Sequence, residues 1–188
     1  MRIISLIIHL HQSFAGLCRR YFEDLSLLVL RLVGAKVFLE SGLTKWSGWF
    51  DFDEQKYDLF LYEFFCPDPI RPGALLLCSQ ETLDYVGGSM TVDIIETLAL
   101  VAGVAETLLP VLLILGLFTR LGALGLLSLT MFIQLAVFPS WDHWWNPAVW
   151  WAVVMFALLA RGPGIFSVDR LVGLDGESRV GRDGATPV

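Results

Sequence analysis

The chain has 188 residues, is 55% hydrophobic and carries a formal net charge of −6. Its mean hydropathy of +0.64 is rare in a soluble domain and typical of a membrane protein with several spans. Spans of about 20 residues each would use much of the chain and leave no room for a second large domain. The acidic balance argues against nucleic acid as a partner, and the lipid bilayer is the first expected partner.

Residues 1–24 are predicted to form an N-terminal interfacial segment. An amphipathic helix over residues 1–21 would lie in the membrane surface, with Arg19 and Arg20 at the headgroups. A signal peptide is the alternative, because an apolar run follows Arg2. That run is short, and the small-residue pattern of a cleavage site is poor.

The first predicted span covers residues 25–46. Arg31, Lys36 and Glu40 lie inside it, and Lys45 lies near its end. Charged side chains within a span are costly unless they are paired or hydrated, so they are functional candidates by default. Lys36 and Glu40 are four residues apart and therefore share one face of the helix.

A long outer loop is expected over residues 50–92. It is acidic, and it contains an apolar stretch (57–65) and a second segment (73–85) that both suit short helices. Cys66 and Cys78 share this loop. A structural disulfide, two free thiols, and a redox or copper-binding pair assisted by His143 all remain open.

Three further spans follow, over residues 94–118, 121–138 and 145–160. Pro110 would kink the second span without ending it, and the short link near Thr119 makes the second and third spans an antiparallel hairpin. Ser167 is expected to cap a short helix after the fourth span, and residues 174–188 are expected to be disordered. The predicted fold is all-α: an integral membrane four-helix bundle over residues 25–173, with an N-terminal interfacial helix and a long helical outer loop.

Basic residues predict the orientation. Eight arginines fall in the N-terminal segment, the link between the second and third spans, and the C-terminal tail, whereas the other two connections hold only Lys56 and Arg71. Because basic residues favour the cytoplasmic side, both termini are expected in the cytoplasm, with the protein in the cell inner (plasma) membrane.

Charged side chains from the first two spans form the candidate catalytic cluster. Glu106 is placed near the middle of the second span, at a depth similar to Glu40 and Lys36. In one interpretation, Glu40 and Glu106 handle protons while Lys36 and Arg31 hold their charge or polarise a carbonyl. In the other, the four charges form an ionic contact that only fixes helix packing.

Aromatic residues gather at the outer side. All seven tryptophans lie at the predicted outer ends of the first and fourth spans. They suit an interfacial anchor, or the lining of a site for a flat aromatic ligand such as a quinone. Trp46, Trp145 and Gln134 are the candidate cofactor-binding residues, Gln134 also being suited to a hydrogen bond between helices. No metal site is predicted.

Four motifs stand in a fixed order along the chain: the segment 31–45 (RLVGAKVFLESGLTK), Glu106 followed by Leu108-Leu109-Pro110, the segment 115–120 (LGLFTR), and Arg161-Gly162-Pro163-Gly164 with Ser167-Val168-Asp169. Together they resemble the DoxX family. The resemblance covers residues 25–173 and implies a four-helix membrane bundle. It also implies association with membrane oxidoreductase assemblies, including quinone-linked thiosulfate oxidation and thiol-stress complexes. Residues 64–67 are similar to the branch found with gene sets for bufferin-type copper peptides.

The leading functional hypothesis is therefore an inner-membrane subunit of a redox or metal/thiol-stress system, linked to a quinone or to electron transfer. A protein partner or a second copy of the chain is expected. The alternatives are a transporter or export helper for a small solute or peptide, and a non-catalytic membrane scaffold. The sequence leaves open whether the protein is an enzyme.

Overall fold

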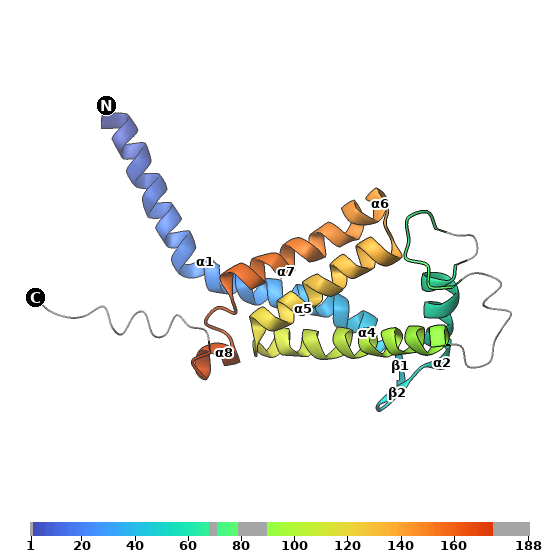
Figure 1. The fold of residues 1–188 in the computed structure, drawn as a ribbon. Coiled ribbons are helices and arrows are strands. Elements are labelled where there is room, and N and C mark those ends of the chain that lie inside the picture. The colour runs from blue at the N-terminus through green and yellow to red at the C-terminus, as the bar shows by residue number, and fades with distance from the viewer. Residues whose placement is uncertain (1, 68–70, 79–89, 175–188) are drawn as a thin grey trace, which may run out of the picture.

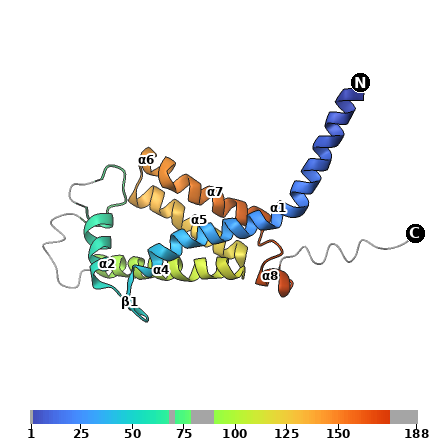
Figure 2. The same cartoon turned by 180° about the vertical axis from the view of Figure 1, so that it is seen from behind.

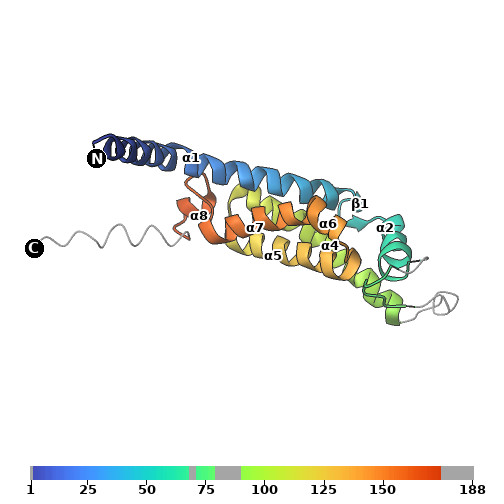
Figure 3. The same cartoon turned by 90° about the horizontal axis from the view of Figure 1, so that it is seen from above.

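The computed structural model describes residues 2–67, 71–78 and 90–174. The chain is mostly helical, and its long helices lie side by side (Figures 1 and 3). The α4–α5 turn and α8 lie at one end of this assembly, and α2 and α6 lie at the other. The end with the α4–α5 turn and α8 is named the inner end, and the end with α2 and α6 the outer end.

The first half of the described chain supplies one long helix and the outer cap (residues 46–65). Helix α1 (Arg2–Leu43) is followed by a two-stranded antiparallel hairpin, β1 (Trp46–Gly48) and β2 (Asp51–Phe52), in which Trp46 pairs with Phe52. A short helix α2 (Glu54–Asp58), capped by the Asp53 carboxylate, continues into the π-helical segment η1 (Leu59–Phe65).

The second half contains the other long helices. These are α4 (Met90–Leu115), α5 (Thr119–Phe132) with its π-helical extension η2 (Ile133–Val137), and α7 (Val149–Arg161). Short helices α6 (Trp141–His143) and η3 (Trp144–Ala148) precede α7, and α8 (Val168–Leu171) follows it. Two segments, Met90–Leu115 and Thr119–Val137, are long and apolar enough to cross a membrane.

Helix α1 has two parts with different surroundings. Its N-terminal half projects away from the other helices (Figure 1), and its apolar side chains there are exposed. Its second half packs along α4, while α5 packs against both α4 and α7. The core of this region includes Ala35, Leu113, Leu126 and Met155, all fully buried.

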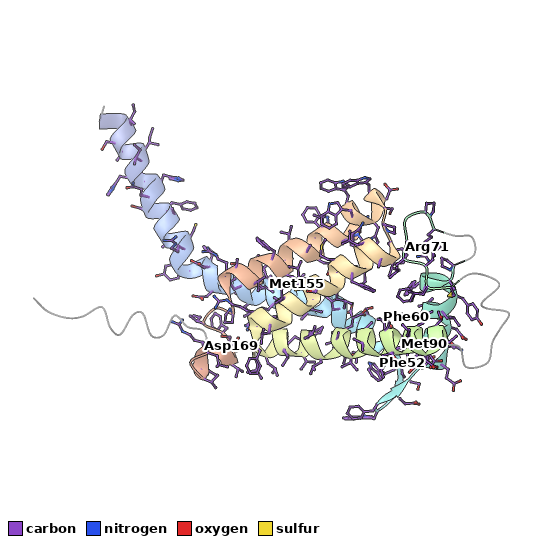
Figure 4. The ribbon with its side chains drawn as sticks, in the orientation of Figure 1. Phe52, Phe60, Arg71, Met90, Met155 and Asp169 are labelled. Carbon is purple, nitrogen blue, oxygen red and sulfur yellow. A yellow bond between two sulfur atoms is a disulfide. The ribbon has the colours of Figure 1, made fainter. Side chains whose placement is uncertain are left out.

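The segment after α7 closes the inner end. Asp169 accepts hydrogen bonds from the backbone N–H groups of Phe118 (2.7 Å) and Thr119 (2.9 Å), at the start of α5. Arg31, fully buried on α1, donates to the carbonyl of Phe166 in the same segment. A carboxylate at a helix N-terminus satisfies otherwise unpaired N–H groups. Figure 4 shows Asp169 at this end of the molecule, opposite Phe60 in the outer cap.

Several sequence predictions are confirmed at this level. The chain is helical, the turn before Thr119 is short, α4 continues through Pro110, and Ser167 caps α8 by accepting from the N–H of Arg170. The hairpin β1–β2 was not predicted. The predicted first span extended to Trp46, whereas α1 ends at Leu43 and Trp46 begins β1. The segment predicted as a helix over 73–85 is not helical in its described part, 73–78. The tail over 175–188 lies outside the described residues.

Candidate functional site

An apolar cavity of about 230 Å³ lies towards the outer end of the assembly. Side chains from α1, η1, α4, α5, η2, α6 and α7 line it. Most are aromatic or aliphatic: Val37, Phe38, Phe60, Phe64, Phe65, Leu98, Ala102, Leu129, Phe132, Ile133, Val137, Phe138 and Trp151. Four lining residues carry polar groups, namely Ser41, Lys45, Glu106 and His143. A cavity with apolar walls and a few polar groups is the usual form of a small-molecule site.

Lys45 and Glu106 form a buried ion pair in the cavity wall. The Lys45 Nζ atom lies 2.6 Å from Glu106 Oε2 and 3.1 Å from Ser41 Oγ. The two charged side chains are only 10% and 7% exposed. A buried pair of this kind is weak evidence of stability, since the cost of removing both charges from water is comparable with their attraction. It does place a charged hydrogen-bond donor in the wall of an otherwise apolar cavity.

Gly42 lets α1 meet α4 at this level, and Gly103 lets the Phe52 ring of β2 approach α4. A Cβ atom on Gly42 would lie 2.5 Å from the backbone oxygen of Glu106, and one on Gly103 would lie 2.7 Å from the Phe52 ring. Contacts this short exclude a side chain at either position. Close approach of α1 and α4 is what brings Lys45 within reach of Glu106.

The outer cap closes the cavity with phenyl rings. Phe60 stacks edge-on against Phe64, and Phe64 against Phe138. Directly after η1, Cys66 forms a disulfide with Cys78, and the backbone N–H of Leu77 donates to the carbonyl of Phe65. Of the alternatives that the sequence left open, the structure therefore contains the disulfide. In this state neither thiol is available as a metal ligand.

His143 supplies a second polar group, held by Gln134 and Ser140. Its Nδ1 atom lies 2.6 Å from Gln134 Oε1, and Gln134 Nε2 donates to the backbone oxygen of Ser140 at 3.0 Å. The His143 ring also stacks on Phe138, over which the Arg71 guanidinium lies at 4.9 Å. The ring is therefore held by both a hydrogen bond and an aromatic contact.

This arrangement specifies the proton position on His143. A backbone carbonyl only accepts hydrogen bonds, so the Gln134 amide must turn its NH₂ group to Ser140 and its oxygen to His143. The Nδ1 atom must then carry the proton. In the neutral ring, Nε2 is left with a free lone pair, so the cavity is lined by an ammonium donor (Lys45) and by an imidazole whose second nitrogen accepts.

Burial lowers the pKa of His143 from its ordinary value. The folded protein therefore holds the His143 proton less tightly than the unfolded chain does, and the neutral ring contributes to the free energy of unfolding. That contribution is complete above the unfolded pKa, near 6.5, and is lost as the pH falls below it. We therefore expect the melting temperature of the wild type to fall more between pH 7 and pH 5 than that of a His143→Phe variant. Thermal melts in detergent at both pH values test this, and parallel pH dependence of the two proteins would contradict it.

The four residues predicted as one catalytic cluster do not meet. Glu106 lines the cavity, but Lys36 and Glu40 pair with each other at 3.5 Å on the exposed side of α1, where their side chains are 71% and 68% exposed. Arg31 lies at the inner end beside Gly116. The physical reason is the helical period: positions 36 and 40 share one face, and positions 31 and 45 lie on nearly the opposite one.

The three predicted cofactor-binding residues are not among those that line the cavity. The Trp46 ring donates from Nε1 to Thr107 Oγ1 at 3.0 Å and faces an open groove shared with Trp49, Leu108 and other apolar side chains. Trp145 is 63% exposed. Gln134 acts through His143. Trp151, which contacts Phe38 edge-on, is the tryptophan that lines the cavity.

Lys45 and His143 line the cavity but were not among the predicted catalytic or cofactor-binding residues: Lys45 was named only as one of the charges of the first span, and His143 only as a possible copper ligand. A signal for Lys45 was present, because it follows Arg31 by 14 residues, close to four helical turns, and a helix continued to that position would carry both residues on one face. In the structure α1 ends at Leu43, and Lys45 lies just beyond it. His143 had no such signal, because its position depends on how the segment before α7 folds back over η2.

A comparison with protein-family models matches residues 26–139 to the DoxX family. Comparisons with curated proteins and with solved structures gave no match. The matched residues begin within α1, end two residues after η2 and include Lys45, Glu106 and Gln134, whereas His143 and Trp151 lie beyond them. Since the match covers more than half of the chain and two helices are apolar enough to span a bilayer, this protein belongs to the DoxX family of membrane proteins.

Proposed function

We propose that this protein is a quinone-binding subunit of a membrane redox system. The observation that carries the proposal is the cavity itself, which combines walls of aromatic rings with one buried ammonium donor. A quinone is a flat apolar ring with carbonyl acceptors, and it reaches proteins through the bilayer. Such a ring fits between phenyl and indole faces, which favour stacked or edge-on contacts.

Three of the four polar side chains have a definite task in this proposal. Lys45 donates a hydrogen bond to one ring oxygen, while Glu106 holds the Lys45 ammonium through their ion pair and exchanges protons with the bound ring. His143, with its free Nε2 lone pair, accepts a hydrogen bond from a ring hydroxyl when the ligand is reduced. The quinone, when bound, supplies the capacity to take up or release electrons and protons together.

The proposal also includes a four-span bundle in the cell inner membrane, with both termini in the cytoplasm. Two observations support it. The N-terminal half of α1, the α4–α5 turn and α8 share the inner end of the assembly (Figures 1 and 2). Arg120 and Arg161 lie at that same end, at the start of α5 and the end of α7. Because basic residues favour the cytoplasmic side, this supports a cytoplasmic inner end.

A titration of the purified protein with a short-chain benzoquinone tests the proposal. Isothermal titration calorimetry in detergent micelles is expected to show saturable binding. A Leu129→Trp variant places an indole in the cavity and is expected to weaken binding at least about 10-fold, the equivalent of 1.4 kcal/mol. Leu124→Trp, on the exposed side of the same helix, is the matched control and should bind like the wild type.

Two results would contradict the proposal. One is the absence of saturable binding by the wild type in both detergent and bilayer nanodiscs. The other is equal binding by the Leu129→Trp and Leu124→Trp variants, because this would place the ligand outside the cavity.

A further inference from the structure

The Lys36–Glu40 pair is exposed on the surface of a helix that packs in the membrane-spanning part of the protein. Both side chains are more than two-thirds exposed, and their partner is each other, at 3.5 Å. The exposed neighbours on the same part of α1 are apolar, including Val29, Leu32, Val33 and Leu43. Two adjacent charges on an apolar surface need a polar environment that lipid does not supply.

The depth of this pair follows from contacts on both sides of it along α1. Arg31 lies against Gly116 at the end of α4, and Gly42 lies against the backbone of Glu106. Lys36 and Glu40 therefore run beside residues 106–116, much of which belongs to the apolar segment Met90–Leu115. At 1.5 Å per residue they lie about 8 and 14 Å outward from Arg31, so Glu40 is well inside a hydrocarbon layer of about 30 Å.

We infer that this face of α1 binds the same face of a second copy of the chain in the membrane. A two-fold axis along the membrane normal would place the two α1 helices side by side at equal depth. Because each copy brings one positive and one negative charge, about 6 Å apart along the helix, Lys36 of each copy can reach Glu40 of the other. The face is thus complementary to itself, as a two-fold interface requires.

The four charges would then form a closed group with alternating signs. The apolar side chains beside them would be shared between the two helices, and the surrounding protein would shield the charges from acyl chains. Interhelical polar contacts of this type stabilise association in bilayers. This inference rests on the proposed four-span bundle but not on quinone binding, because Lys36 and Glu40 do not line the cavity.

Charge reversal in reconstituted vesicles tests the inference. Copies labelled with donor and acceptor fluorophores are mixed in phosphatidylcholine vesicles at a low protein-to-lipid ratio, and energy transfer reports association. Lys36→Glu copies and Glu40→Lys copies are each expected to self-associate at least about 10-fold more weakly than the wild type. Mixed together, the two variants are expected to associate again, and the double variant Lys36→Glu/Glu40→Lys is expected to associate with itself.

Recovery in the mixture also shows that both single variants are folded. Arg19→Glu reverses a charge on the projecting half of α1, where the side chain is 81% exposed, and should leave association unchanged. The inference would be overturned by a wild type that shows no association, by single variants that self-associate normally, or by a mixture that does not recover.

Discussion

Replacing Lys45 by methionine is expected to destabilise the protein by about 3 to 5 kcal/mol, because it leaves the Glu106 carboxylate buried without a partner. The Glu106 side chain is 7% exposed, and its described hydrogen-bond partner is the Lys45 ammonium. The free energy of unfolding can be measured by titration with sodium dodecyl sulfate in mixed micelles. A loss below about 1 kcal/mol would mean that the pair is solvated or absent in the native protein.

The double variant Lys45→Met/Glu106→Met separates stability from binding. Replacing both members of a buried pair by apolar residues of similar size is often neutral or stabilising, so stability should return to within about 1 kcal/mol of the wild type. Quinone binding should be lost in both the single and the double variant, since the charged donor is gone. Arg19→Met is the control: it removes an exposed member of the Arg19–Glu23 pair and should change stability by less than about 0.5 kcal/mol.

Gly116→Ala is expected to destabilise the protein by about 3 to 4 kcal/mol. Gly116 has a φ of +66°, which disfavours any residue with a side chain. The added Cβ atom would also overlap the buried guanidinium of Arg31 and lie 2.6 Å from Ser167 Cβ. Overlap in a packed interior forces neighbouring groups to move and adds to the cost of backbone strain. Denaturation in mixed micelles measures the change.

Gly16→Ala is the matched control for Gly116→Ala. Gly16 lies within α1, and among the described residues no atom outside its own helical backbone and chain neighbours lies within 4 Å of the position of an added Cβ. Because alanine is the better helix former, this variant should be neutral or more stable by up to about 1 kcal/mol. Similar behaviour of the two variants would contradict the described packing of Arg31 against the α4–α5 turn.

The helical architecture could be predicted from the sequence, because long apolar runs and their interruptions indicate where helices begin and end. Residues 94–118 and 121–138 were predicted within a few residues of the observed α4 and α5–η2. The tight turn before Thr119 was also predicted. These features depend on local sequence, in which backbone hydrogen bonds are satisfied within each helix.

The site could be predicted from the sequence only in part. Glu106 was identified from its charge inside an apolar run, but its partner was taken from the wrong face of α1. The helical period would have excluded Lys36 and Glu40 from a shared site with Arg31, and it would have favoured Lys45. The cavity walls could not be predicted, because Phe64, Phe138 and Trp151 come from three segments that meet only after the outer cap folds over the helices.

The most direct test of the quinone site is a structure of the protein with a brominated short-chain benzoquinone. The proposal predicts bromine density inside the cavity, with one ring oxygen within hydrogen-bonding distance of Lys45 Nζ and the ring among Phe60, Phe138 and Trp151. Ligand density confined to the surface groove beside Trp46 and Trp49, with protein side chains filling the cavity, would contradict it.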